Sequence, residues 1–353
     1  MTPLLAVEGL SVELPTPRGA LRAVDGVDLA VAPGQTLGIV GESGCGKTML
    51  ARAVLQLLPK RARVGGRVTF EGQDLARLSP AALRRLRGPA IAVVFQDPMS
   101  SLNPVLTIGS QLVETLRAHL GIPGAAAEAR SVALLADVGI PAPEQRLRQY
   151  PHQLSGGMRQ RVAIAIALSC EPRLLIADEP TTALDVTVQA QILDLLAREQ
   201  RRRRMAVILI THDLGVVAGR TEEVAVMYAG RVVERAPTAS LFAGMRMPYT
   251  QALLAAIPKL DAAPHTRLPA IAGRPPDPTR PLPGCSFAPR CPRAERACRE
   301  AKPPLAGSEA HVFACWRPLP SPNPLPQGRR LPSPPPLAGG GREEGFDAAP
   351  AGR

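Results

Sequence analysis

A short glycine-rich segment constrains the fold of this chain more than any other feature. Gly41–Thr48 reads GESGCGKT, which fits the pattern G-x-x-x-x-G-K-[ST]. It follows a β-branched run at Thr36–Val40 and precedes a helical run at Met49–Leu58. In that context the glycines let backbone N–H groups turn inward onto phosphate oxygens, and the start of the helix adds its positive end. The segment therefore predicts a phosphate-binding loop between a strand and a helix.

The last two residues of this segment carry the predicted chemistry. Lys47 is placed against the β- and γ-phosphates of a nucleotide, and the Thr48 hydroxyl against a Mg²⁺ ion that bridges the same oxygens. A glycine-rich structural turn is the alternative, and the Lys-Thr pair at this offset argues against it. The predicted nucleotide-binding residues are Gly41, Glu42, Ser43, Gly44, Cys45, Gly46, Lys47 and Thr48.

The pattern around this loop is typical of an α/β domain. From Leu5 to about Arg235, short β-branched runs alternate with amphipathic helical stretches, which favours a largely parallel core sheet. Ser110–Gly139 is rich in Ala and Leu at helical spacing and predicts a mostly helical insertion. The expected core strands are Thr36–Val40, Ile91–Phe95, Leu174–Asp178 and Val207–Thr211.

One of these strands ends in two adjacent carboxylates. The run LLIADE places Asp178 and Glu179 after four apolar residues, and strand alternation directs the two side chains differently. Asp178 would hold the Mg²⁺ shell, while Glu179 would reach a water aligned on the γ-phosphate and polarise it.

A second potential anion site lies further along the chain. Leu154–Arg161 reads LSGGMRQR and opens a helical run at Val162–Ser169, so a serine and two glycines stand at a helix start. One nucleotide does not need two helix N-termini so far apart in sequence, unless the second serves the nucleotide of another copy. The segment therefore predicts a dimer.

Together these segments resemble the ATP-binding subunit of ABC transporters over roughly Leu5 to Arg235. The family's Walker A motif falls on Gly41–Thr48, and its Walker B motif on Leu174–Asp178, followed by Glu179 as the catalytic carboxylate. Its other motifs fall on Gln96 of VVFQDP (Q-loop), on Leu154, Ser155, Gly156, Gly157, Met158 and Gln160 (signature), on Ala183, Leu184 and Asp185 (D-loop), and on His212 of ITHDL (switch histidine).

The resemblance implies a fold and a working arrangement. The fold is a P-loop NTPase with a RecA-like parallel-sheet core, an antiparallel N-terminal β-subdomain and an inserted helical subdomain at about 97–165, within an ATP-binding domain at 1–236. Two such domains pack head to tail, so that Ser155 and Gly157 contact the γ-phosphate held by the partner. His212 contacts the γ-phosphate, and Gln96 binds Mg²⁺ or the attacking water. ATP and Mg²⁺ are the implied cofactors.

Finer detail resembles the dipeptide/oligopeptide importer group of that family. The stretches GESGCGKT, QDPMSSLNP, YPHQLSGGMRQRVAIAIAL and GCSFAPRCPRAERAC carry this resemblance, and Met158 resembles the D-type member of the group's pair of ATPases. The implied partners are an F-type ATPase paralogue or a second copy, two permease subunits and a solute-binding protein outside the membrane. Relatives in the group also carry nickel or other small solutes. The implied location is peripheral, on the cytoplasmic face of the inner membrane.

One position departs from the pattern of the family. Many ABC ATPases stack adenine on an aromatic side chain near the N-terminal strands, and the corresponding position here is Leu14. An aliphatic contact still buries the base, so the interpretation is that ATP binding depends mainly on phosphate contacts.

The C-terminal part has a different composition. Prolines and cysteines dominate from about Pro258 to Trp316, which predicts a small module at 237–318 that needs a staple. Cys285, Cys291, Cys298 and Cys315 could hold a [4Fe–4S] cluster or zinc, or remain free thiols. His311 is an alternative ligand, but a solvated loop histidine is the favoured interpretation. Residues 319–353 are Pro- and Gly-rich and predict a disordered tail.

Composition limits the alternative functions. Lys and Arg number 42 against 30 Asp and Glu, a net charge of +12 that permits nucleic-acid binding, but aromatic residues are only 3%. Stacking surfaces for single strands are therefore not expected, and no nucleic-acid partner is predicted. No run approaches the roughly 18 apolar residues of a membrane span, and no secretory signal is expected. An ABC-type ATPase not coupled to transport, either nucleic-acid-associated or regulatory, is the alternative function.

Overall fold

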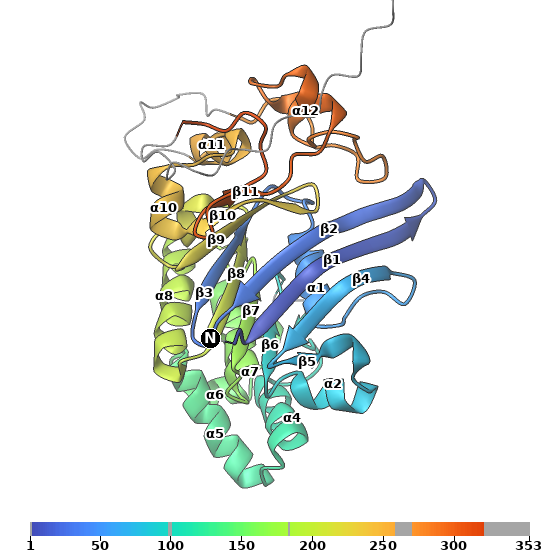
Figure 1. Cartoon of the computed structure of the whole chain (residues 1–353). Coiled ribbons are helices and arrows are strands. Elements are labelled where there is room, and N and C mark those ends of the chain that lie inside the picture. The colour runs from blue at the N-terminus through green and yellow to red at the C-terminus, as the bar shows by residue number, and fades with distance from the viewer. Residues whose placement is uncertain (1, 98–100, 183, 258–269, 321–353) are drawn as a thin grey trace, which may run out of the picture.

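Two β-sheets organise this protein, and helices pack around them (Figure 1). The computed structural model describes residues 2–97, 101–182, 184–257 and 270–320. Within these ranges one sheet has eight strands and the other has four. The predicted α/β fold, with a parallel-sheet core, an antiparallel N-terminal sheet and an inserted helical part, is confirmed.

The larger sheet has a parallel centre. Its strands are β3 (Thr36–Val40), β6 (Ile91–Val94), β7 (Leu174–Asp178), β8 (Ala206–Thr211), β9 (Glu223–Tyr228), β10 (Arg231–Pro237), β11 (Ala306–Gly307) and β12 (Val312–Phe313). They lie in the order β11-β12-β10-β9-β3-β8-β7-β6, parallel from β9 through to β6. β7 and β8 are buried along their whole length, because elements cover both faces of the sheet. The four predicted core strands are confirmed to within a residue.

The smaller sheet is antiparallel and N-terminal. Its strands are β1 (Leu5–Thr16), β2 (Gly19–Val31), β4 (Arg63–Phe70) and β5 (Gln73–Asp74), in the order β2-β1-β4-β5. A short helical connection, η1 (Leu75–Arg77) and α2 (Pro80–Leu86), leads from this sheet to β6. Val27, Leu29 and Val31 of β2 are buried while Asp28 and Ala30 between them are exposed, the alternation expected of a sheet with one covered face.

Helices follow the strands of the larger sheet. The helices beside the parallel strands are α1 (Lys47–Val54), α8 (Val186–Arg203) and α9 (Leu214–Val217). α1 begins two residues before the predicted start, because Gly46 is its N-cap. α8 begins at Val186, where the Asp185 side chain accepts a hydrogen bond from the Val188 N–H.

The predicted helical insertion is a set of separate helices. They are α4 (Ile108–Leu120), α5 (Gly124–Asp137), α6 (Pro143–Leu147), η2 (Pro151–Gln153) and α7 (Gly156–Leu168). The single stretch expected at Ser110–Gly139 is two helices, since Gly121 ends α4 in the left-handed conformation with φ 64°. Helices α4–α6 lie at the end of the molecule opposite the C-terminal helices (Figure 1). Among the described residues, no helix is both long and apolar enough to cross a bilayer.

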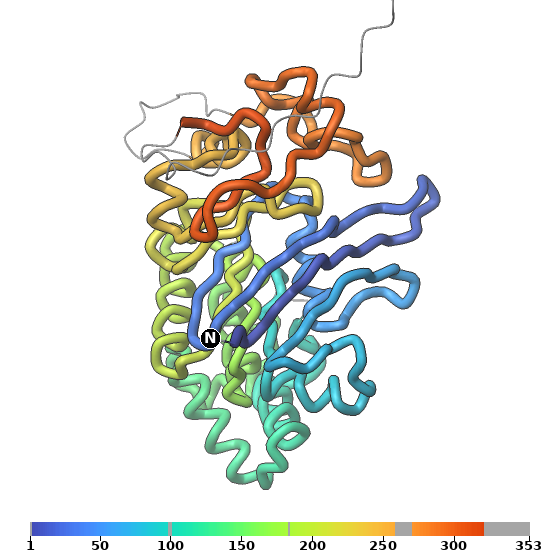
Figure 2. The backbone as a smooth tube through the Cα atoms, in the orientation of Figure 1, coloured from blue at the N-terminus to red at the C-terminus, as the bar shows by residue number. Residues whose placement is uncertain are grey.

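The C-terminal region is joined to the core sheet. It contains α10 (Thr238–Ala243), α11 (Pro248–Ala255), η3 (Ala288–Arg290) and α12 (Arg296–Glu300), besides β11 and β12. β12 pairs with β10 and extends the larger sheet, so a C-terminal strand runs beside β10 (Figure 2). Phe287 belongs to the same buried core as Leu175 and Leu209. This region therefore shares the sheet and the buried core of the ATP-binding part, while the predicted domain boundaries stay a prediction. Most of the predicted tail, residues 321–353, lies outside the described residues.

Candidate functional site

The loop Gly41–Thr48 joins β3 to α1 and leaves no room for side chains at two of its glycines. Gly46 caps α1 with φ 108°, a left-handed conformation that favours glycine. A Cβ at Gly46 would overlap the carbonyl oxygen of Ala23, and a Cβ at Gly41 would overlap that of Met227. The loop therefore packs directly on the backbone of β2 and β9.

Lys47 lies at the first turn of α1, only 4% exposed. Its ammonium Nζ donates to the carbonyl oxygens of Gly41 at 2.7 Å and Glu42 at 3.2 Å. The same Nζ lies 3.7 Å from Oε1 of Glu179. The cation is thus held inside the curve of the loop, facing the carboxylate that ends β7.

Asp178 is the last residue of β7 and is 1% exposed. Burial raises the pKa of Asp178, while a hydrogen bond with the side chain of Thr48 opposes that shift. Within the described structure, Oδ1 of Asp178 is buried and has no hydrogen-bond partner. A buried carboxylate oxygen without a hydrogen-bond partner, next to a threonine hydroxyl, offers the oxygen ligands that a hard divalent cation binds. The pair formed by Thr48 and Asp178 therefore fits Mg²⁺.

Glu179 is the point at which the other predicted catalytic residues meet. Its Oε2 accepts hydrogen bonds from Nε2 of Gln96 at 3.0 Å and from the Thr182 hydroxyl at 2.9 Å. Nδ1 of His212 lies 3.4 Å from the same oxygen. Glu179 adopts φ 47°, so a non-glycine residue is held in the left-handed region just after the strand. Strain of this kind persists where surrounding contacts fix the residue, here the contacts to its carboxylate.

The electrostatics of this group keep Glu179 ionised. The hydrogen bond with His212, together with Thr182 and the Lys47 ammonium, lowers the pKa of Glu179 to about 2. The same hydrogen bond raises the pKa of the half-exposed His212. The carboxylate and the imidazolium therefore stabilise one another near neutral pH.

The signature segment lies elsewhere. Ser155 is the N-cap of α7, where its hydroxyl accepts from the Met158 N–H at 3.3 Å. Gly157 faces Val188 of α8 so closely that a Cβ would lie 2.7 Å from Val188 Cγ1. In the described part of the chain, the residues that line the pocket beside the loop include none of Leu154, Ser155, Gly156, Gly157, Met158 and Gln160. Asp185 caps α8, and Ala183 lies outside the described residues.

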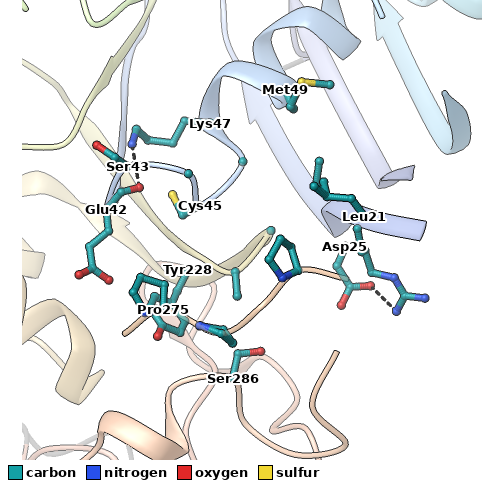
Figure 3. A pocket seen from close by; sticks show the side chains of 18 of the residues that line it. Leu21, Asp25, Glu42, Ser43, Cys45, Lys47, Met49, Tyr228, Pro275 and Ser286 are labelled. Carbon is teal, nitrogen blue, oxygen red and sulfur yellow. Dashed lines mark hydrogen bonds and ion pairs between the residues drawn. The ribbon is translucent and has the colours of Figure 1, made fainter. Parts of the chain in front are cut away.

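A pocket of about 290 Å³ opens beside the loop (Figure 3). Its lining includes Lys47, Thr48, Gln96 and Glu179. Leu14 does not line it, so that prediction is wrong: the side chain in that place is Leu21, the residue paired with Leu14 across β1 and β2. Sequence reasoning missed the remaining wall residues, which include Arg22, Asp25, Tyr228, Pro275, Pro276, Pro278, Leu282 and Lys302.

The C-terminal region contacts the loop itself. The Arg290 guanidinium forms two hydrogen bonds with the Glu42 carboxylate, at 2.6 and 2.9 Å, and is only 3% exposed. The Tyr249 hydroxyl accepts from the Glu42 N–H at 2.9 Å. Tyr228, Tyr249 and Phe287 pack ring against ring behind this pair. No spacing rule could have indicated a pair 248 positions apart.

The four C-terminal cysteines come together without a metal arrangement. Cys285, Cys291, Cys298 and Cys315 line one pocket of about 20 Å³, close to the room that one water needs. Burial raises the pKa of Cys285 and Cys291, and that of Cys315 to about 12, so these thiols stay protonated. Within the described ranges no three His, Cys, Asp or Glu side chains are placed to hold a metal ion. The predicted [4Fe–4S] cluster is therefore not supported.

His311 is also not a ligand of these cysteines. Its Nε2 lies 2.8 Å from Oε1 of Glu234, which is fully buried on β10. The favoured interpretation of a solvated loop histidine therefore does not hold, because His311 contacts this buried carboxylate and helps to hold β12 against the core sheet.

Comparison with known proteins places these features in one class. A family model described as "ABC transporter" matches residues 24–182, and one described as "Oligopeptide/dipeptide transporter, C-terminal region" matches residues 233–298. The dimeric ATP-binding cassette MJ0796 bound to ADP and Pi is a structural neighbour, with TM-score 0.59, 27% identity, and coverage of 66% of this chain and 98% of that chain. The cassette cbiO1 of Clostridium perfringens gives TM-score 0.58 at 30% identity, covering 69% of this chain and 92% of its own.

Sequence relatives narrow the class. A probable peptide ABC transporter ATP-binding protein of Sinorhizobium fredii is 50% identical over 317 residues, which are 89% of this chain and 95% of the relative. A dipeptide transport ATP-binding protein of Bacillus subtilis is 49% identical over 319 residues, 90% of this chain and 95% of the relative. This chain belongs to the family of ABC transporter ATP-binding proteins, in the branch with the oligopeptide/dipeptide C-terminal region. It is an ABC-type ATPase that binds ATP.

Proposed function

We propose that this protein is the ATP-hydrolysing subunit of a membrane importer for dipeptides, oligopeptides or a related small solute. The observation that carries the proposal is the convergence of Lys47, Gln96 and His212 on Glu179, at the end of β7 and beside the phosphate-binding loop. The names of the relatives supply the transported class. By the same reasoning the subunit works peripherally, at the cytoplasmic face of the inner membrane.

Mg²⁺ belongs to this proposal as a cofactor. Thr48, Asp178 and Gln96 would hold it, and the unpartnered Oδ1 of Asp178 supports that assignment. Bound there, the ion neutralises charge on the β- and γ-phosphate oxygens. Lys47 would bind the γ-phosphate from the other side, as its buried ammonium already faces the pocket.

Glu179 would act as the general base. A carboxylate with a pKa of about 2 accepts a proton poorly, and its present partners are the reason. A γ-phosphate would draw Lys47 and His212 toward its own oxygens, so that Glu179 loses two favourable contacts and its pKa rises. Substrate binding itself would then turn a paired carboxylate into a base able to take the proton of the attacking water.

A second ATPase subunit is needed in this scheme. Ser155 and Gly157 do not line the pocket of their own chain, so their helix terminus is available to the nucleotide of a neighbour. The partner is an F-type paralogue or a second copy, and two permease subunits and an external solute-binding protein complete the importer. The proposed importer includes no nucleic-acid partner.

Purification of a trapped complex tests the proposal. Tagged Glu179→Gln protein is extracted from native membranes with ATP and Mg²⁺, and every co-purifying chain is identified by mass spectrometry. Two multi-span permeases and a second ATPase are the expected partners, and Lys47→Ala, which weakens nucleotide binding, is the matched control that should lose the ATPase partner. Recovery of nucleic acid or of soluble regulators alone would overturn the transport assignment in favour of an uncoupled ABC-type ATPase.

A further inference from the structure

The pocket beside the loop has two chemically different sides (Figure 3). One side carries Lys47, Thr48 and Glu179, which suit phosphate and metal. The other side is formed by β2, through Leu21 and Arg22, and by a C-terminal segment, Pro275–Leu282. A nucleotide whose phosphates lie on the loop must place its base and ribose away from Lys47, which leaves this second side.

The C-terminal segment is built as a rigid apolar wall. Pro275, Pro276, Pro278 and Pro281 all line the pocket. Each proline fixes its own φ and has no N–H, so the segment is stiff and exposes few donors that a base would have to desolvate. The hydrocarbon faces of the pyrrolidine rings, with the aliphatic Leu21, offer a surface on which an aromatic base packs by dispersion and area burial.

Four contacts hold the segment and its flanking chain against the ATPase core. The Arg22 N–H of β2 donates to the Pro278 carbonyl oxygen at 3.1 Å. Lys302 Nζ lies 2.8 Å from Oδ2 of Asp25, so the chain beyond the segment is also tied to β2. Ahead of the segment, Arg290 donates to the carbonyl oxygens of Ile271 at 3.2 Å and Ala272 at 2.8 Å. A wall held at both ends loses little conformational entropy when a ligand packs on it.

We propose that Pro275–Leu282 forms one wall of the subsite for the base and ribose of the nucleotide, beside Leu21 and Arg22. The C-terminal region thereby replaces the aromatic stacking residue that β1 and β2 lack. This inference rests on the proposed ATPase function, since it assumes that the loop holds the phosphates.

Binding of two ligands by the full-length chain tests the wall. ATP carries base and phosphates, whereas inorganic tripolyphosphate carries phosphates alone. The variant Pro276→Gly/Pro278→Gly should bind ATP roughly tenfold to a hundredfold more weakly with tripolyphosphate affinity unchanged, because stacking contacts of a base amount to that factor. The control Pro283→Gly/Pro292→Gly changes two exposed prolines that do not line the pocket, and it should bind both ligands as the wild type does.

The outcomes separate the two proposals. Wild-type protein that binds no ATP would overturn the ATPase function and this inference together. If the wild type binds ATP and the Pro276→Gly/Pro278→Gly variant binds it with unchanged affinity, the proposed role of Pro275–Leu282 is overturned while the ATPase function stands. As a second measurement, 8-azido-ATP should label a peptide containing Pro275–Leu282 in the wild-type chain. Label confined to other segments would contradict the proposal.

Discussion

The phosphate-binding loop and the C-terminal region 270–320 line the same pocket, but different kinds of contact hold them there. The loop is fixed by neighbours in sequence: Gly46 caps α1, and Lys47 donates to Gly41 and Glu42. The C-terminal region is fixed by distant partners, above all Arg290 on Glu42 and β12 on β10. Local contacts therefore shape the loop, together with its packing on the backbones of Ala23 and Met227, whereas the C-terminal wall is held mainly by distant partners.

The largest expected effect concerns chemistry in the loop region. Glu179→Gln keeps the size of the side chain but removes the proposed base, so kcat for ATP hydrolysis should fall by roughly 10²- to 10⁴-fold while ATP binding persists. Steady-state phosphate release by the assembled transporter measures this. Glu144→Gln, an exposed position on α6, is the control and should leave kcat unchanged. Retained turnover in Glu179→Gln would exclude Glu179 as the base.

The second largest effect concerns the backbone conformation and packing of the phosphate-binding loop. Gly46→Ala should abolish ATP binding and lower the free energy of unfolding by about 3 kcal/mol, because a Cβ there overlaps the Ala23 carbonyl in a left-handed conformation. Gly44→Ala is the matched control. Gly44 is also left-handed, with φ 79°, but a Cβ there would meet nothing within 4 Å. It should cost about 1–2 kcal/mol, from backbone strain alone. Equal losses in the two variants, by urea denaturation, would contradict the packing argument.

A smaller effect is expected where the two regions join. Arg290→Ala removes a buried guanidinium and leaves the Glu42 carboxylate without it, which should lower the free energy of unfolding by about 1–3 kcal/mol. ATP affinity should fall as well, since Arg290 also anchors Ile271 and Ala272 ahead of the proline wall. Arg296→Ala breaks an exposed pair with Glu300 and should cost at most about 0.5 kcal/mol. A cost for Arg290→Ala no larger than that control would show that the regions are not coupled.

The smallest effect is a pH dependence that belongs to the loop region alone. The pKa of Glu179 is lowered from 4.5 to about 2, so the stability it contributes is present above pH 4.5 and is lost as the pH falls toward 2. The pKa of His212 is raised above 6.5, so its contribution is present below pH 6.5 and is lost as the pH rises through the raised value. Their joint contribution should therefore be greatest between about pH 4.5 and 6.5.

His212→Gln is the variant that checks this dependence. The difference in Tm between wild type and His212→Gln, followed from pH 3 to 9, should be largest inside that window. The Arg290–Glu42 pair offers the contrast: its guanidinium, whose pKa is raised by Glu42, stays charged throughout. A Tm difference that does not vary with pH would show that the His212–Glu179 contact contributes no stability.

Much of the loop region could be predicted from sequence because its information is local. The strands around Thr36–Val40 and Leu174–Asp178 are short apolar runs, and the glycines of the loop mark a turn at fixed offsets. The sequence predicted a mostly helical insertion without placing its division at Gly121, since a glycine inside a helical pattern is equally compatible with a continuous helix. The place of Leu14 was wrong for a related reason: the side chain that reaches the pocket belongs to its cross-strand partner, Leu21.

For the C-terminal region, local sequence patterns indicated neither the strand pairing nor the packing. Its prolines and cysteines suggested a stapled module, yet β12 extends the core sheet and Phe287 lies in the main core. Strand pairing between Val312 and Arg235 depends on register across the fold, which no local pattern states. Chemistry suggested a metal for the cysteines, and their described arrangement around a small pocket does not supply a metal site.

The sequence by itself determined the α/β class, the phosphate-binding loop and the identity of the residues that meet at Glu179. The α/β class and the loop follow from turn chemistry, hydrophobic period and fixed spacing, which act within a few residues. Gln96 and His212 were assigned only through the resemblance to ABC transporter ATP-binding subunits. Only the tertiary structure decided that Arg290 binds Glu42 and that prolines near residue 276 line the same pocket as the loop. Such contacts form between segments some 250 positions apart, where the packing of the whole core, rather than any local preference, selects the partner.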